Sequence, residues 1–354
     1  MVFRVFFSLI LITIFGIYVT VKDDVKENTA IIDQNSVNEN TMETSDKIKE
    51  LTDNESRPEQ GVSKWIGKTS NQLLDEYGEP DRIDPSAYGY NWWIYNDTLS
   101  KYIQFGVNEK DKKIVTLYSS AEDINLYPFF IDQTVESLYK ELNMNSYIEL
   151  NWKGTEYRFE LSEEDLHYRP LIKFGDMYAQ VYLDKILGQV SGVRFMDAKT
   201  LIMHKPYELT YRGELDEPEE LTDEEWKLVE EGSQQQILDL TNIIRTRFDL
   251  GTLEFDEKIS AVAFKHSEDM MVNEYFDHVS PDDKDVGDRL KEGGVSYYSA
   301  GENIAAQYTD AIAAVEGWLN SKGHRDIMLN EDFTRLGVGV YKRYYTQNFV
   351  ALSD

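Results

Sequence analysis

The chain has 354 residues, of which 36 are basic and 65 acidic, so its formal net charge is −29. This acidity argues against general nucleic-acid binding, because such binding needs a basic surface to displace the counterions of the phosphate backbone. The sequence contains no cysteine, which excludes disulfide bonds and metal sites with thiolate ligands.

The first 21 residues form an apolar segment. It contains one charge, Arg4, followed by an uncharged run that ends at Val21. A run of about 17–20 apolar residues is long enough to cross a bilayer, and no convincing small-x-small cleavage site follows it. We therefore expect residues 1–21 to remain as a single-pass membrane anchor, with Arg4 inside and the body outside. The alternative is a cleaved signal, which would give a secreted protein.

A polar, acidic stretch follows the apolar segment. Residues 22–60 are rich in Asp, Glu, Asn, Thr and Ser and contain few large apolar side chains. Such a stretch cannot bury enough apolar surface to offset the entropy that is lost on ordering. We expect residues 22–60 to form a disordered acidic stalk between the membrane and the folded domains.

Residues 61–206 contain a weak internal repeat. Each unit begins with a helical pattern and continues with short alternating stretches that favour antiparallel strands. The first helix is predicted over Ser70–Tyr77, with Thr69 or Ser70 as its N-cap, and the second lies within FIDQTVESLYKEL. The repeat predicts an α+β domain of two similar halves. Its strand aromatics either pack in the core or line a groove; they are Tyr88, Tyr90, Trp92 and Trp93.

A second acidic stretch, residues 207–232, is expected to be a linker whose final part is helical. Beyond it, residues 233–354 begin with two helical patterns. In QQQILDLTNIIRTRFDL the apolar residues recur at helical spacing, and in DEKISAVAFKHSEDMMVNEYF they share a face with His266. A histidine on an apolar face is more often a hydrogen-bonded core residue than a metal ligand.

Four motifs follow one another in the order FDHVSP, GENIA, WLNSKGHRDIML and TRLGVGV. Together they resemble the CAP superfamily of cysteine-rich secretory proteins, antigen 5 and pathogenesis-related 1 proteins, whose module is also called the SCP domain. The likeness is greatest to its cysteine-free bacterial branch, and residues 61–206 resemble the CAP-associated N-terminal domain. The resemblance implies an α+β fold in which residues 233–354 form an α-β-α sandwich, with an antiparallel sheet between helical layers.

The resemblance also implies a polar cleft. In eukaryotic members of the superfamily this cleft holds two histidines and two glutamates, and the motifs place His278, Glu302 and His324 at three of these positions. The fourth position, in a W-x-x-E pattern, is Ser321 here, so the second acid is absent. Glu316 is not expected to replace it, because at about 100° per residue it points away from the direction of Ser321.

Two chemical interpretations of this cleft remain open. The imidazoles of His278 and His324 and the carboxylate of Glu302 could hold zinc and leave one coordination position open. Alternatively, the same side chains form a hydrogen-bonded polar cluster that joins two loops without a metal. The hydroxyl of Ser321 is explained as a cap of the helix that follows it.

We expect an extracellular, membrane-tethered CAP-domain protein. It would bind an unidentified ligand or protein partner through the cleft and would not be an efficient enzyme, because the second acid is missing. One alternative is a zinc-dependent hydrolase or protease that uses His278, Glu302 and His324. Another is a structural protein of the cell wall or spore, in which the N-terminal domain does the docking.

Overall fold

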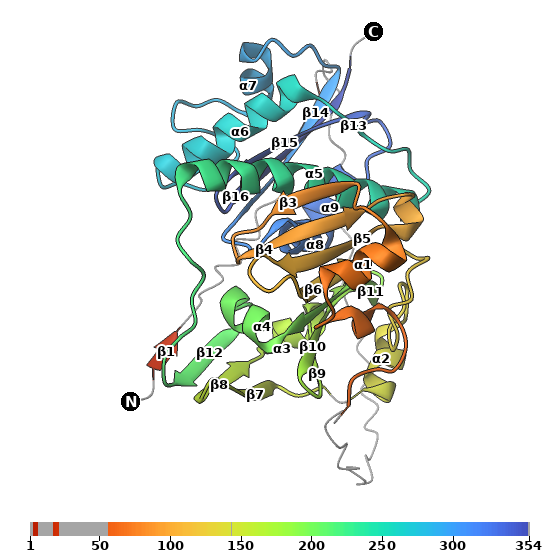
Figure 1. The fold of residues 1–354 in the computed structure, drawn as a ribbon. Coiled ribbons are helices and arrows are strands. Elements are labelled where there is room, and N and C mark those ends of the chain that lie inside the picture. Colours follow the sequence, from red (N-terminus) through yellow and green to blue (C-terminus); the bar gives the residue numbers. More distant parts are fainter. Residues whose placement is uncertain (1–2, 6–16, 21–55, 143, 353–354) are drawn as a thin grey trace, which may run out of the picture.

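The computed structural model describes residues 3–5, 17–20, 56–142 and 144–352. Most of these residues form two domains that pack against each other. Figure 1 shows the C-terminal domain at the top and the N-terminal domain below it.

The N-terminal domain is built on a seven-stranded antiparallel sheet with the order β3-β4-β5-β6-β11-β10-β9. The strands are β3 (Arg82–Pro85), β4 (Tyr90–Tyr95), β5 (Ile103–Asn108), β6 (Ile114–Ser119), β9 (Leu171–Phe174), β10 (Met177–Asp184) and β11 (Gln189–Asp197). A second sheet has the order β1-β12-β8-β7 and consists of β1 (Phe3–Val5), β12 (Glu208–Arg212), β8 (Thr155–Glu160) and β7 (Tyr147–Trp152). The helices are η1 (Val62–Trp65), α1 (Ser70–Tyr77), η2 (Leu99–Lys101), α2 (Val135–Glu141), α3 (Glu163–Tyr168) and α4 (Ala198–His204).

The two predicted halves of this domain join into one sheet. The first half, α1 with β3 to β6, meets the second half, α2 with β9 to β11, where β6 pairs with β11. Strands β7 and β8 leave this sheet and pair with each other and with β12. Helix α1 has the predicted bounds because Thr69 and Gln72 form a capping box, in which each side chain accepts a hydrogen bond from the other residue's backbone N–H.

The C-terminal domain is an α-β-α sandwich, as predicted. Its sheet has the order β13-β15-β16-β14-β2 and consists of β13 (Glu254–Phe255), β15 (Arg335–Tyr341), β16 (Tyr344–Ala351), β14 (Ser299–Ala306) and β2 (Ile17–Thr20). Neighbouring residues of β16 face opposite helical layers: Val350 packs with α6 (Glu257–Val272) and α7 (Val286–Glu292), whereas Phe349 belongs to the core on the other side. That side is covered by α5 (Asp223–Arg247), α8 (Ala311–Leu319) and α9 (Lys322–Met328).

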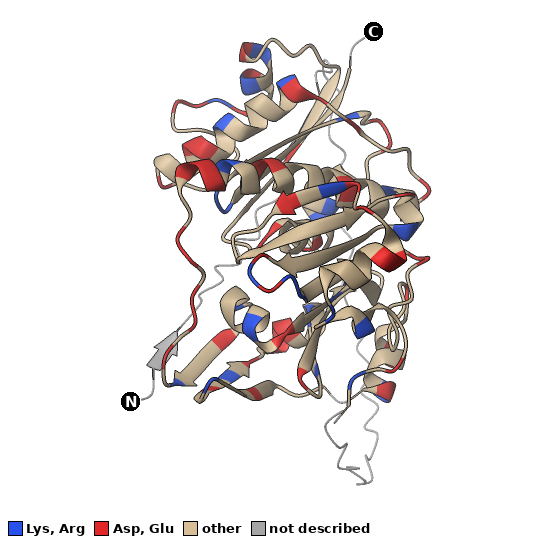
Figure 2. Cartoon of the chain, in the orientation of Figure 1, with Lys and Arg blue, Asp and Glu red and all other residues tan. Residues whose placement is uncertain are grey.

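Most of the acidic stretch 207–232 has regular structure. Residues 208–212 form β12, and α5 begins at Asp223, so the boundary expected at residue 233 falls inside a helix. Thr222 and Glu225 form a capping box at its start, and acidic side chains in a first turn interact favourably with the helix dipole. Figure 2 shows acidic residues along the segment before α5 and at the beginning of that helix. Within this stretch, residue 207 and residues 213–222 lie outside helices and strands.

The expected membrane anchor, residues 1–21, lies largely outside the described residues. Its described parts are β1, which pairs with β12, and β2, which pairs with β14. Among the residues that the structure describes, no helix has both the length and the apolar character needed to cross a bilayer. The stalk expected over residues 22–60 is described only from residue 56 onward.

The two domains share one hydrophobic core. A single cluster of buried side chains draws on both of them and includes Tyr88, Tyr90, Trp92, Tyr118 and Tyr182 from the N-terminal domain and Ile237, Ile244, Val315 and Trp318 from the C-terminal domain. Trp93, the next residue of β4, lies against a second cluster of buried side chains inside the N-terminal domain. The aromatic residues of β4 therefore pack in hydrophobic cores. The seven-stranded sheet covers the layer of α5, α8 and α9 (Figure 1).

Buried polar contacts also cross this interface. Nη2 of Arg194 in β11 is 2.7 Å from Oδ1 of Asp310, the N-cap of α8. The phenolic hydroxyl of Tyr118 in β6 donates a 2.7 Å hydrogen bond to Oε1 of Glu316 in α8. If the domains separated, these groups would have to be rehydrated or left unpaired, so the contacts favour this one arrangement of the two domains.

We predict that the domains remain associated after the chain between them is cut. A specific protease site inserted between Pro218 and Glu219 lies in the exposed segment before α5, and its cleavage should give two fragments that elute together in gel filtration. They should separate only in denaturant, because the shared core and the buried ion pairs remain. Two separate peaks under native conditions would contradict the shared core.

Candidate functional site

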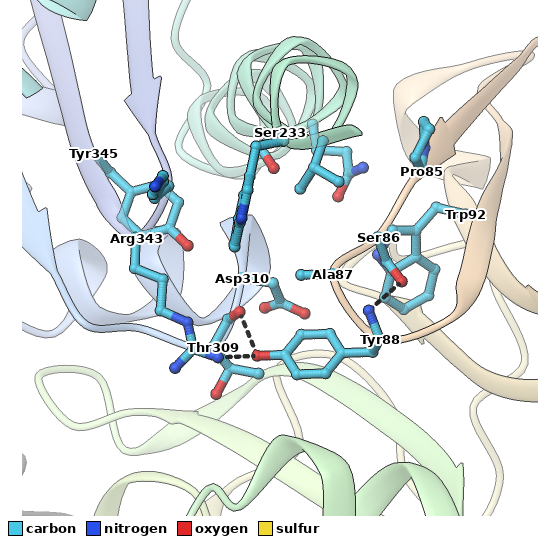
Figure 3. A pocket seen from close by; sticks show the side chains of 14 residues that line it. Pro85, Ser86, Ala87, Tyr88, Trp92, Ser233, Thr309, Asp310, Arg343 and Tyr345 are labelled. Carbon is cyan, nitrogen blue, oxygen red and sulfur yellow. Dashed lines mark hydrogen bonds between the residues drawn. The ribbon is translucent and has the colours of Figure 1, made fainter. Parts of the chain in front are cut away.

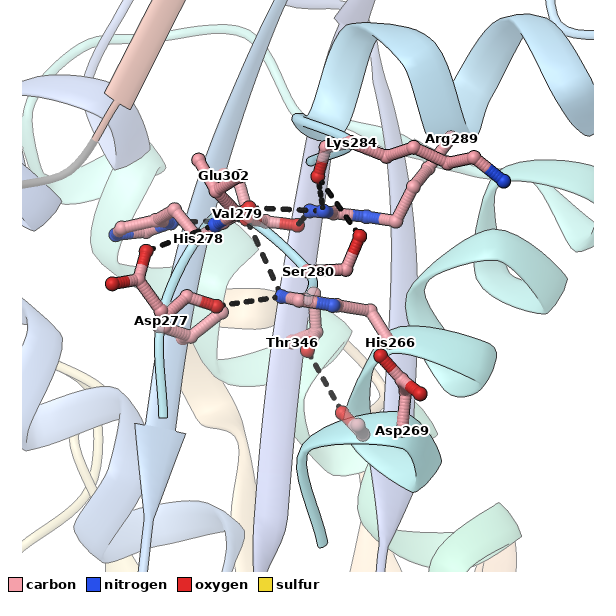
Figure 4. Close-up of polar contacts among 12 residues, drawn as sticks. His266, Asp269, Asp277, His278, Val279, Ser280, Lys284, Arg289, Glu302 and Thr346 are labelled. Atoms are coloured by element: carbon pink, nitrogen blue, oxygen red, sulfur yellow. Dashed lines mark hydrogen bonds and ion pairs between the residues drawn. The ribbon is translucent and has the colours of Figure 1, made fainter. Parts of the chain in front are cut away.

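Glu302 lies in β14, and its side chain is fully buried. Its Oε1 is 2.9 Å from Nδ1 of His278, and its Oε2 accepts a 2.6 Å hydrogen bond from Nη2 of Arg289 (Figure 4). Burial on its own would raise the pKa of Glu302, but Arg289, His266 and His278 together lower this pKa to about 2. The carboxylate is therefore ionised at neutral pH and accepts from both neighbours.

His278 lies in the loop between α6 and α7, and 2% of its surface is exposed. Because an ionised carboxylate can only accept hydrogen bonds, the neutral ring carries its proton on Nδ1, which faces Glu302. Its Nε2 then carries a free lone pair. Nε2 is buried and has no hydrogen-bond partner among the described residues. His278 thus presents an acceptor nitrogen that is oriented by Glu302.

Arg289 connects three parts of this site. It lies in α7, and besides its bond to Glu302 its Nη1 donates to the backbone carbonyls of His278, at 2.9 Å, and Lys284, at 2.8 Å. One guanidinium therefore neutralises the buried carboxylate and fixes the loop that carries His278. A carboxylate without this partner would be an uncompensated buried charge.

His266 lies beside the same carboxylate. Its Nε2 is 3.1 Å from the carbonyl oxygen of Asp277 and 3.8 Å from Oε1 of Glu302, and the ring is buried on α6 (Figure 4). Burial lowers the pKa of His266, and Glu302 opposes this effect. The expectation of a hydrogen-bonded core histidine agrees with these contacts, which also place it next to the cleft carboxylate.

His324 lies on α9, and its ring is buried with 6% exposure. Its carbonyl oxygen accepts a 3.1 Å hydrogen bond from Nδ2 of Asn303 in β14. Burial, followed by the electrostatic influence of His278, lowers the pKa of His324 to about 4. Its Nε2, like that of His278, is buried without a partner among the described residues. The site thus contains two buried imidazoles, each with an unsatisfied nitrogen.

The predicted role of Ser321 was wrong, whereas the prediction that Glu316 does not replace the missing acid agrees with its contacts. Ser321 is the N-cap of α9, but its side chain makes no capping hydrogen bond, so the expected capping role of the hydroxyl was wrong. Glu316 does not contact His278, Glu302 or His324 through its carboxyl group, which is bound by Tyr118 and, at 2.6 Å, by Oγ of Ser191. Burial raises the pKa of Glu316.

The contacts of Glu302 bear on the predicted zinc shell of His278, Glu302 and His324. Both carboxylate oxygens are already engaged, by His278 and by Arg289. Across residues 56–142 and 144–352, no three His, Asp or Glu side chains are grouped so that they could hold a metal ion. In this arrangement Glu302 binds Nδ1 of His278 and orients its ring, as carboxylates behind metal-ligating histidines do, and the free donors are the two Nε2 atoms.

Two hollows lie elsewhere in the described structure. One cavity of about 20 Å³ lies between the domains, bordered by Tyr88, Trp92, Asp310 and Arg343 (Figure 3). It has room for about one water molecule, which excludes an organic ligand. A wider groove of about 520 Å³ contains none of the predicted site residues; it lies between α5 and α6 and is lined by residues such as Lys227, Glu230, Phe255, Phe264 and Glu268.

Arg289 is the site residue that the sequence did not reveal. Its local pattern, VGDRLKEGG, is that of a short surface helix, and Asp288 and Lys291 beside it are both well exposed. The signal that could have found it is the carboxylate itself. Glu302 lies between buried residues of one strand, so its charge has to be compensated by a cationic side chain. An arginine is suited to this role because it stays charged when it is buried.

Comparison with known proteins decides the family. Residues 66–207 match the model "CAP-associated N-terminal", and residues 238–352 match the model "Cysteine-rich secretory protein family", abbreviated CAP. A Bacillus subtilis (strain 168) protein named "Uncharacterized membrane protein YlbC" is 49% identical over 293 residues, which are 83% of this chain and 84% of that protein. This chain is a CAP-family protein. The resemblance inferred from the four motifs is thereby confirmed.

Other proteins match part or most of the chain. The protein named YkwD from the same Bacillus subtilis strain is 40% identical over 119 residues, which are 33% of this chain and 46% of that protein. An extracellular protein containing an SCP domain from Bacillus anthracis has a crystal structure with a TM-score of 0.79 and 45% identity; the match covers 87% of this chain and 99% of that one. A cysteine-rich secretory protein from Staphylococcus aureus has a TM-score of 0.72 and 27% identity, over 84% of this chain and 97% of that one.

We predict that protonation of His324 contributes to acid unfolding. Its pKa of about 4 in the folded CAP domain lies below the ordinary value of 6.5, so the unfolded chain takes up the proton first. The stabilisation is complete above pH 6.5 and is lost as the pH falls to about 4, and it amounts to about 3 kcal/mol. The free energy of unfolding, measured by denaturant titration between pH 7 and pH 4, should fall less steeply for His324→Asn than for wild type.

The exposed His167 in α3 provides a matched control. The His167→Asn variant should keep the wild-type pH dependence of unfolding. An unchanged slope for His324→Asn would show that the ring is not buried in its neutral form.

Proposed function

We propose that this CAP-family protein is a membrane-tethered, extracellular binding module, and that its cleft binds a ligand through Nε2 of His278 and Nε2 of His324. The observation that carries the proposal is that both atoms are buried and unpartnered among the described residues. A buried polar atom without a partner costs about 1–3 kcal/mol, and a ligand that satisfies it recovers this cost.

The tautomer of His278 defines the class of ligand. When the ring of His278 is neutral and its Nδ1 donates to Glu302, its Nε2 can accept a hydrogen bond or coordinate a metal ion, but it cannot donate. The low pKa of His324 keeps that ring neutral at physiological pH as well. The fitting ligand is therefore a hydrogen-bond donor, such as a hydroxyl or ammonium group, or a divalent transition-metal ion held by two imidazoles.

The same contacts favour binding over hydrolysis. A catalytic zinc site has three protein ligands and one open position for water. Glu302 is held by His278 and by Arg289, and these partners, together with His266, keep it ionised in spite of its burial. Ser321 takes the place of the second acid. The alternatives of a zinc-dependent hydrolase and of a cell-wall or spore structural protein have no comparable support from the described residues.

Zinc serves as a probe for the two nitrogen atoms. We predict that wild-type protein binds one Zn²⁺ weakly in calorimetry at pH 7, and that His278→Ala and His324→Ala each abolish this binding. Glu302→Gln should weaken it by about 10–100-fold, because the carboxylate orients His278 without being a ligand. Ser321→Glu should tighten it by adding a third donor at the rim.

His167→Ala removes an exposed histidine and serves as the matched control, so it should keep the wild-type affinity for zinc. Any zinc held only by the acidic surface would bind equally to all of these variants. Equal affinity in wild type, His324→Ala and His167→Ala would contradict the proposal that the two Nε2 atoms act together.

The proposed location rests on the apolar segment of residues 1–21 and on the names of two relatives. One is called a membrane protein and the other is described as extracellular. Both described strands of this segment, β1 and β2, lie at sheet edges, so insertion into a bilayer removes one edge strand from each sheet and leaves the remaining pairings in place.

We predict that the chain stays in the membrane fraction after carbonate extraction and that protease added to intact protoplasts degrades the body. Mass spectrometry of the membrane-bound protein should detect peptides from residues 1–21. A mature N-terminus near residue 22, with the body released into the medium, would show instead that the segment is a cleaved signal.

A further inference from the structure

Residues 319–325, the corner between α8 and α9, include His324, one of the two histidines of the proposed site. Helix α9 has seven residues, and Ser321 at its N-cap makes no side-chain capping bond. Short helices without caps have little stability of their own and take their position from tertiary contacts. The contacts of this corner therefore decide where the ring of His324 lies.

Two of these contacts come from the N-terminal domain. The backbone N–H of Lys185 donates a 2.7 Å hydrogen bond to Oδ1 of Asn320, the residue that ends α8. Nη1 of Arg325 in α9 donates a 2.8 Å bond to Oδ2 of Asp184. Asp184 and Lys185 adjoin each other at the turn between β10 and β11, so one turn of the N-terminal domain holds both sides of the corner.

Asp184 connects this turn to α9 with a single carboxylate. Its Oδ1 accepts hydrogen bonds from the backbone N–H groups of Ile186 and Leu187, at 2.9 and 3.0 Å, which close the turn. Its Oδ2 is the atom that binds Arg325. The side chains of Asp184 and Arg325 are 4% and 8% exposed, so water screens this ion pair far less than a surface pair.

Within the C-terminal domain, Arg325 has weaker restraints. Its Nη1 also donates to the carbonyl of Leu319, at 3.1 Å, and its guanidinium lies 4.9 Å from the ring centroid of Phe248. On the other side of α9, Asn303 donates to the carbonyl of His324. Helix α9 is thus held between β14 and the N-terminal domain, and no described residue hydrogen bonds to Nε2 of His324.

We propose that Asp184 is a positioning residue for the cleft: through Arg325 the N-terminal domain fixes the place of the His324 ring. The inference deepens the proposed function, because it matters for ligand binding only if the cleft binds through His324. The N-terminal domain is then a working part of the binding site.

The variant Asp184→Asn tests this inference while preserving the turn. The amide oxygen of Asn can still accept from the N–H groups of Ile186 and Leu187, whereas the charge that holds Arg325 is removed. The matched control is Asp239→Asn. Asp239 in α5 also forms an ion pair across the domain interface, at 2.9 Å with Arg82 in β3, but it does not touch the α8–α9 corner.

The first readout follows the histidine rings by NMR at pH 7. The chain has five histidines, so the ring signals of His324 can be assigned with a His324→Gln variant. The ring signals of His324 should shift and broaden in Asp184→Asn, and they should keep their wild-type positions in Asp239→Asn. An unmoved His324 in a folded Asp184→Asn protein would overturn the proposal.

The second readout is the affinity for Zn²⁺. Asp184→Asn should weaken it about tenfold, within the range seen when partners behind a ligand are removed, and Asp239→Asn should leave it unchanged. If Asp184→Asn does not fold, Arg325→Lys, which keeps the charge but changes the geometry of the pair, takes its place in both measurements. Equal loss of affinity in the Asp184 and Asp239 variants would indicate a purely structural effect and would overturn the proposal.

The two readouts separate this inference from the proposed function. If wild-type protein binds no Zn²⁺, the ligand-binding role of the two Nε2 atoms fails, and the NMR comparison still decides whether Asp184 positions His324. If wild type binds Zn²⁺ and the His324 signals do not respond to Asp184→Asn, the binding role stands and the positioning role fails.

Discussion

The buried carboxylate of Glu302 is the constraint around which the C-terminal domain is arranged. An ionised group in the interior is tolerated only with an opposite charge and hydrogen bonds, and Arg289 and His278 supply these. Arg289 also binds the carbonyl of His278, so α7, the loop before it and β14 are joined at one point. As a result, Nδ1 of His278 faces the carboxylate and its Nε2 faces away from it.

The second constraint is the contact between the domains. The helical layer formed by α5, α8 and α9 is covered by the seven-stranded sheet, and both sides contribute to one core. Glu316 shows the consequence most clearly. It lies in α8, the helix that leads to α9 and His324, yet its carboxyl group serves the interface with Tyr118 and Ser191. The helix that precedes α9 is therefore anchored in the other domain.

Much of the local structure followed from the sequence. The N-cap expected at Thr69 or Ser70 and the motif order from FDHVSP to TRLGVGV predicted the helix of residues 70–77 and the sandwich fold correctly. The contact between His278 and Glu302 could be expected from the motifs because the family resemblance carries it. The start of α5 at Asp223 was missed, although Thr222 and Glu225 are a capping signal, because the high acidity of the stretch suggested a linker.

What the sequence determined by itself rests on short-range physics: caps, hydrophobic periodicity and the spacing of motif residues act within a few positions of the chain. Tertiary structure decided the rest. The pairing of Asp184 with Arg325 joins residues 141 positions apart, and that of Tyr118 with Glu316 joins residues 198 positions apart. No local pattern marks such partners, because the strength of an ion pair or a hydrogen bond depends on the distance between its two groups in space. Only the folded structure sets that distance.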